Sequence, residues 1–125
     1  MITGIEHIAI FSNDTARLKD WYIEMFDFKQ VYDNGKGTFF LKAQNGAMIE
    51  FVSTDRGEIP PDHLLKGLRH IAISTDDLPG TADKLKAAGV EVISEPVIFA
   101  GGIGTFFFRD PDGNALHLIL RPDQL

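Results

Sequence analysis

Two short stretches decide the fold: IEHIAI at residues 5–10 and LRHIAI at residues 68–73. Each centres on a histidine, His7 or His70, that precedes the same Ile-Ala-Ile run. A polar, acidic stretch and a helical pattern follow each copy, and a strand-like run with one polar group among apolar residues closes each half. This internal repeat indicates a duplicated module. A repeated imidazole and a repeated late polar residue predict one metal site built between the two copies.

The late polar residues are Glu50 and His117, and the chain from His7 to Glu50 is nearly as long as that from His70 to His117. All four side chains lie on predicted strands with apolar neighbours, so we expect them to point into a sheet interior or a cleft. An ionised carboxylate buried without partners costs several kcal/mol. Glu50 therefore requires a cation, a hydrogen-bond network or a raised pKa.

Imidazoles beside a carboxylate suit one divalent ion, and Zn, Ni, Fe, Mn and Co all fit such a donor set. The predicted metal ligands are His7, Glu50, His70 and His117. Taken singly, a histidine on a strand is more often a satisfied interior group than a ligand. The alternative is therefore a duplicated fold that kept its cleft without a functional metal.

The remaining pattern predicts strand, helix, strand, strand, strand in each half, with first strands at residues 5–11 and 67–74, a short strand at 90–93 and a turn at 110–113. Apolar residues recur at helical spacing after the first strand of each copy, and acidic residues precede them as helix caps. In the second half Asp76 or Asp77 is the predicted cap, and Pro79 lies in the first turn. The segment 55–66 is rich in proline, glycine and charge, which is typical of a linker. We predict an α+β fold in one 125-residue domain, with modules 1–54 and 67–125 joined by linker 55–66.

The composition of the chain argues against several classes of function. The chain is 44% hydrophobic and 24% charged, as in ordinary globular proteins. Its net charge of −6 argues against a nucleic-acid partner, which would favour a basic face. The absence of cysteine excludes disulfides, thiolate metal sites and a cysteine nucleophile. No signal peptide or membrane-spanning run is visible, so we expect a soluble cytoplasmic protein.

The sequence resembles the vicinal oxygen chelate superfamily, which includes glyoxalase I, fosfomycin-resistance proteins, bleomycin-resistance proteins and extradiol dioxygenases. The matching stretches are residues 5–10, 48–51, 69–73 and 108–114, the last running into residues 116–118. The resemblance implies two βαβββ modules that form a curved mixed sheet around a metal cleft. Short members of the family are usually homodimers, and their cleft is often shared between subunits.

Members similar to glyoxalase I place ligands at the positions of His7, Glu50, His70 and the late strand, where they most often carry glutamate. This chain carries His117 there instead. Three neutral imidazoles and one carboxylate leave a net positive centre, which polarises a bound carbonyl more strongly. The replaced carboxylate is also the usual proton shuttle. His117 either takes that role, completes the metal sphere, or marks a loss of activity.

The resemblance implies a metal-dependent lyase or isomerase of the glyoxalase I type. Such an enzyme acts on a small oxygenated substrate through an enolate-like intermediate, with His117 and Glu50 as the candidate catalytic groups. The alternatives are sequestration of a hydrophobic or drug-like small molecule, as in bleomycin-resistance proteins, and dioxygenase-type chemistry. The expected partners are a small-molecule substrate and a second copy of the chain, with no nucleic acid and no membrane.

Overall fold

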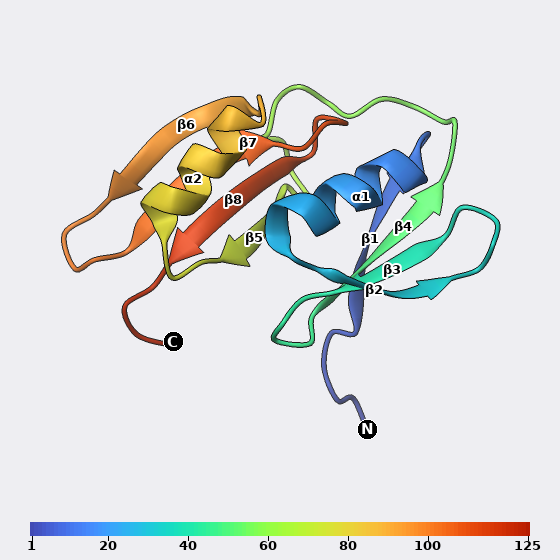
Figure 1. Ribbon diagram of the computed structural model, residues 1–125, viewed down its shortest axis with the longest axis horizontal. Helices are drawn as coiled ribbons and strands as arrows, with labels where there is room; N and C mark the ends of the chain where they lie inside the picture. The colour runs from blue at the N-terminus through green and yellow to red at the C-terminus, as the bar shows by residue number, and fades with distance from the viewer. The chain divides into compact units, whose positions relative to one another are not determined.

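The computed structural model describes all 125 residues and divides into two compact units, Met1–Gly57 and Glu58–Leu125. Each unit has the order strand, helix, strand, strand, strand and folds into one four-stranded sheet that carries one helix (Figure 1). The predicted α+β fold of two βαβββ modules is confirmed. Most of the segment that was expected to link the modules belongs to the second unit.

The first unit has the strand order β1-β4-β3-β2, in which β1 and β4 are parallel and the other pairs are antiparallel. The parallel pair needs a long crossover, which the helix and the two intervening strands provide. The elements are β1 (His7–Ser12), α1 (Thr15–Phe26), β2 (Lys29–Asp33), β3 (Phe39–Lys42) and β4 (Met48–Ser53).

The second unit repeats this topology with the order β5-β8-β7-β6, and its parallel pair is β5 with β8. Neither helix of the chain is long and apolar enough to cross a membrane. The elements are β5 (His70–Ser74), α2 (Leu78–Ala87), β6 (Glu91–Ile98), β7 (Gly104–Arg109) and β8 (Ala115–Leu120).

The helix of the first unit covers one face of its sheet. Asp14 caps α1, and its side chain accepts a hydrogen bond from the backbone N–H of Arg17 at 3.2 Å. The buried stripe of α1 includes Tyr22, whose ring meets the ring of Phe51 edge-on at 5.2 Å. Because side chains alternate along β4, Ile49 and Phe51 face the core and Glu50 faces the opposite side.

The second unit is built in the same way. Asp77 caps α2 by accepting from the backbone N–H of Gly80, and Pro79 lies in the first turn, as predicted. The helix buries an apolar stripe against the inward side chains of β7 and β8, while Phe107 is on the other face. The largest fully buried side chains of this core are Leu78, Leu85, Phe106, Phe108, Leu116 and Leu118.

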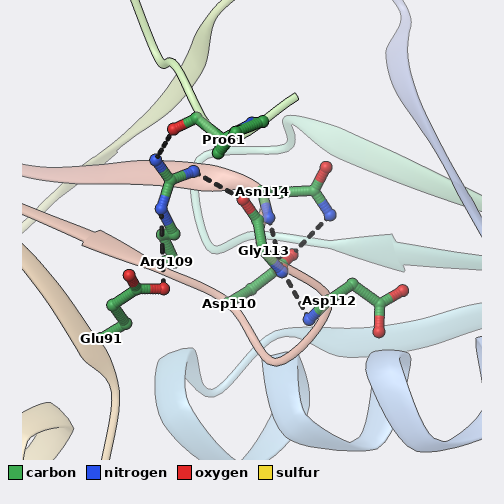
Figure 2. A network of polar contacts seen from close by, with 7 residues as sticks. All are labelled: Pro61, Glu91, Arg109, Asp110, Asp112, Gly113 and Asn114. Carbon is green, nitrogen blue, oxygen red and sulfur yellow. Dashed lines mark hydrogen bonds and ion pairs between the residues drawn. The ribbon is translucent and has the colours of Figure 1, made fainter. Parts of the chain in front are cut away.

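The turn between β7 and β8 is held by one buried carboxylate. Asp110 Oδ1 accepts backbone hydrogen bonds from Asp112, Gly113 and Asn114, and its Oδ2 accepts one from the Asn114 side chain at 2.9 Å (Figure 2). Aspartate that bonds to its own following backbone favours a tight reversal. This confirms the turn predicted at residues 110–113, and it fixes the start of the strand that carries His117.

Several strand boundaries differ from the prediction. The first strand begins at His7 instead of residue 5, and β5 begins at His70 instead of residue 67. The short strand predicted at residues 90–93 continues to Ile98 as β6, past Pro96, with two register shifts against β7. An irregular outer strand of this kind tolerates proline because it lacks a second partner to which the missing N–H would donate.

Candidate metal centre

In the first unit, the strand register brings His7 and Glu50 together. Glu50 pairs with Ala9, two residues after His7, so all three side chains are on the face opposite α1. His7 Nε2 lies 3.4 Å from Glu50 Oε1, and His7 Nδ1 lies 2.6 Å from Glu6 Oε1. A carboxylate at Nδ1 orients the ring and favours a proton on that nitrogen. The Nε2 lone pair is then directed towards the side of Glu50.

In the second unit, the equivalent register brings His70 and His117 together. His117 pairs with Ala72, two residues after His70, and the two imidazole rings lie 5.0 Å apart between centroids. Both ring nitrogens of His117 are buried and have no hydrogen-bond partner within the chain. Buried polar atoms without partners are costly and uncommon, so this imidazole has the property expected of a metal ligand.

The electrostatics of His117 favour the neutral imidazole. Burial is the main cause that lowers the pKa of His117, and the neighbouring charges of His70 and Arg121 lower it further. A metal ligand must present a deprotonated ring nitrogen, so a lowered pKa keeps His117 available for coordination or for accepting a proton at neutral pH.

Each pair of polar groups is bordered by a phenylalanine from the neighbouring strand, which the sequence did not single out. Phe40 of β3 meets the ring of His7 edge-on at 5.2 Å. Phe107 of β7 holds the same position in the second unit, where it meets His70 edge-on at 5.6 Å and stacks on His117 at 4.3 Å. The only sequence signal for these two residues is that neighbouring phenylalanines in a strand point to opposite faces of the sheet, so they cannot all face the core.

The four predicted ligands thus lie as two pairs, one in each unit. Within neither unit is a group of three or more histidine, aspartate or glutamate side chains arranged to hold a metal ion. Each pair offers two donors on one sheet face, and a divalent transition ion takes four or more. Imidazole and carboxylate, the donor types of the two pairs, are both ligands that such an ion accepts. The pairs are His7 with Glu50 and His70 with His117.

These features define a class of duplicated βαβββ proteins with imidazole and carboxylate donors on the sheet faces opposite the helices. Residues 4–118 match the model of the Glyoxalase/Bleomycin resistance protein/Dioxygenase superfamily. The chain belongs to this superfamily. Its members differ in reaction, so membership shows the fold and does not by itself assign an activity.

Relatives within the superfamily illustrate that range. The chain is 25% identical over 122 residues to the fosfomycin resistance protein FosX of Listeria innocua, covering 94% of this chain and 90% of the relative. It is 27% identical over 125 residues to a probable lactoylglutathione lyase of Synechocystis, covering 90% and 92%. A crystal structure of a FosX mutant from Listeria monocytogenes, complexed with Mn(II) and 1S,2S-dihydroxypropylphosphonic acid, shares the fold with a TM-score of 0.72. It is 21% identical and covers 94% of this chain and 90% of that chain.

Proposed function

We propose that this protein is a metal-dependent lyase or isomerase of the glyoxalase I type, acting on a small oxygenated substrate. The observation that carries the proposal is the matched geometry of the two pairs. In both units a histidine at the start of the first strand shares a sheet face with the late-strand group, at the same register. Relatives named as a lactoylglutathione lyase and a Mn(II)-complexed FosX support this assignment.

The proposed ligands of one divalent ion are His7, Glu50, His70 and His117, with two donors from each unit. The second pair comes from the same chain or from another copy in a homodimer. When bound, the ion supplies Lewis-acid polarisation of a substrate oxygen. The Glu6 carboxylate holds the His7 ring in place through Nδ1.

Proton transfer is assigned to the two late-strand groups. His117 takes this role when it is not a metal ligand, because its lowered pKa then keeps a ring nitrogen free to accept a proton from a carbon next to the substrate carbonyl. Glu50 adds the only carboxylate of the proposed set, at 3.4 Å from His7. Phe107 stacks on His117 and shields that ring from water, which strengthens electrostatic interactions there.

The first test is metal analysis of protein purified without a histidine tag. We expect about one divalent ion per four-donor site, lost in His7→Ala and in His70→Ala. The matched control is His63→Ala, which removes an imidazole that is outside both pairs and should retain the metal. Isomerase and lyase activity is then profiled on small hydroxy- and oxo-compounds with several added metals.

Two outcomes would contradict the proposal. Metal that persists in both ligand variants would place the ion elsewhere. Absence of metal, combined with tight binding of a flat hydrophobic compound, would favour sequestration over catalysis. Sedimentation of the same samples tests the proposed homodimer.

A further inference from the structure

The second unit contains an open groove of about 530 Å³ that adjoins His70. Its walls come from the segment before β5 and from β5, β6 and β7. Arg69 lies immediately before the first residue of β5, where strand alternation has not begun, so its side chain and that of His70 both line the groove. The other lining residues are His63, Leu64, Ile93, Ser94 and Phe107.

The groove has an unusual electrostatic character for this chain. The protein carries a net charge of −6, yet no carboxylate lines the groove, and Arg69 is its one permanent charge. Arg69 is half-buried and forms no ion pair within the chain. Its Nε donates to the Leu68 carbonyl at 2.7 Å, which orients the guanidinium and leaves its two terminal nitrogens for another acceptor.

The wall next to Arg69 is also held in place. Arg109 Nη2 donates to the carbonyl of Pro61 at 2.6 Å, and its Nη1 donates to the carbonyl of Gly113 at 2.8 Å (Figure 2). Pro61 comes two residues before His63, the first residue of the groove wall. The segment is therefore tied to the end of β7, and the groove is formed before a ligand arrives.

We propose that this groove binds the substrate, and that the substrate is a small oxyanion with a compact apolar body. Arg69 binds the carboxylate, phosphate or phosphonate through its terminal nitrogens, as a planar donor pair suits two anionic oxygens. Leu64, Ile93 and Phe107 contact the apolar body. The inference rests on the proposed function, since His70 belongs both to the groove and to the proposed metal ligands.

The test uses chelator-treated, metal-free protein, so that anion binding is measured apart from any metal. Phenylphosphonate and phenylacetate are titrated by NMR, with phenylacetamide as the neutral analogue and inorganic phosphate as the anion without an apolar body. We expect both aromatic anions to bind, with Arg69→Ala weakening them about tenfold or more. Arg69→Lys should recover part of the loss. The amide should bind more weakly and show no dependence on Arg69.

Lys66→Ala is the matched control, because it removes the same charge from the same segment outside the groove. Equal weakening by Lys66→Ala and Arg69→Ala would overturn the proposal, since only net charge would then matter. Anion binding that requires added metal and does not depend on Arg69 would also overturn the groove proposal, while the proposed metal-dependent function would stand. The opposite result would distinguish the groove proposal from the metal-centre proposal. If anion binding depends on Arg69 and the protein takes up no metal, the groove proposal is supported and the metal centre is refuted.

Discussion

At the scale of single residues, His117 combines a functional property with a structural cost. Its two ring nitrogens are buried without partners, and its ring stacks on Phe107. A side chain chosen only for stability would not leave two polar atoms unsatisfied. Unsatisfied polar atoms of this kind are typical of ligand-binding positions, where some stability is lost so that the side chain can bind a ligand.

His117→Phe should stabilise the metal-free protein, because it removes both unpaired nitrogens and keeps a ring on Phe107. We expect a gain of about 1 kcal/mol in the free energy of unfolding near neutral pH, together with loss of metal binding. Urea unfolding of chelator-treated protein measures the first effect. His63→Phe serves as the control and should change neither. A destabilised His117→Phe protein would instead mean that the imidazole has a structural partner.

The same residue predicts a pH dependence of stability. The pKa of His117 is lowered in the native state, whereas the unfolded chain keeps the ordinary value of 6.5. Below that value the unfolded state takes up a proton that the native state resists, so the free energy of unfolding falls as the pH drops towards the native pKa. Above it, His117 adds no pH dependence. Urea unfolding at about pH 7.5 and about pH 5.5 should show the fall in the wild type and a smaller one in His117→Phe.

The candidate residues were predictable from sequence, but their surroundings were only partly so. His7, Glu50, His70 and His117 follow from the echo between the halves, because a copied module repeats its polar positions. The ring contacts of Phe40 and Phe107 depend on cross-strand register, which alternation alone does not supply. Arg69 was not predicted as a functional residue, because only the folded segment before β5 places it in a groove.

At the scale of elements, the side chain of Arg109 joins three parts of the second unit. It bonds to the carbonyls of Pro61 and Gly113, and it lies 3.7 Å from Glu91 at the start of β6. Its side chain is 11% exposed and its bond to the Gly113 carbonyl is part-buried, whereas its bond to the Pro61 carbonyl is exposed. Glu91 is 74% exposed, so its ion pair with Arg109 contributes little. The planar guanidinium is needed to reach both carbonyls at once.

Arg109→Lys should therefore loosen the segment that precedes β5. The lysine keeps the charge but cannot reach both carbonyls, and we expect a loss of about 1 kcal/mol in the free energy of unfolding. Hydrogen exchange should quicken in the backbone amides of residues 62–65. Glu91→Gln is the control and should change stability by no more than about 0.5 kcal/mol. Equal effects of the two variants would show that the ion pair, and not the carbonyl bonds, holds the segment.

Elements were predicted well where a local signal marks their ends and poorly where none does. Asp77 and Pro79 fixed the start of α2, and residues 110–113 fixed the start of β8. No comparable signal marks the end of β6, whose pairing past Pro96 depends on the neighbouring strand β7. The first strand of each half begins late because Ile5 and Leu68 gain no pairing partner there.

At the scale of the whole molecule, each unit supplies half of the proposed ligand set. Metal that engages all four donors binds only when both units are folded, so it should stabilise both. We expect added metal to slow amide exchange in β1 and β4 and in β5 and β8 alike. His117→Ala should abolish the slowing in all four strands, including the two in the first unit. Slowing confined to one unit would mean that a single pair binds the ion.

Ala9 and Ala72, the partners of the late-strand groups, carry one further consequence. Each has the smallest side chain other than that of glycine, and each is paired across the sheet with a proposed ligand, Glu50 or His117. The alanine in each Ile-Ala-Ile run therefore leaves space on the sheet face that carries the proposed ligands. Valine at either position would add bulk to the sheet face that carries the proposed ligands, so we expect it to reduce the size of the molecule that the proposed site admits.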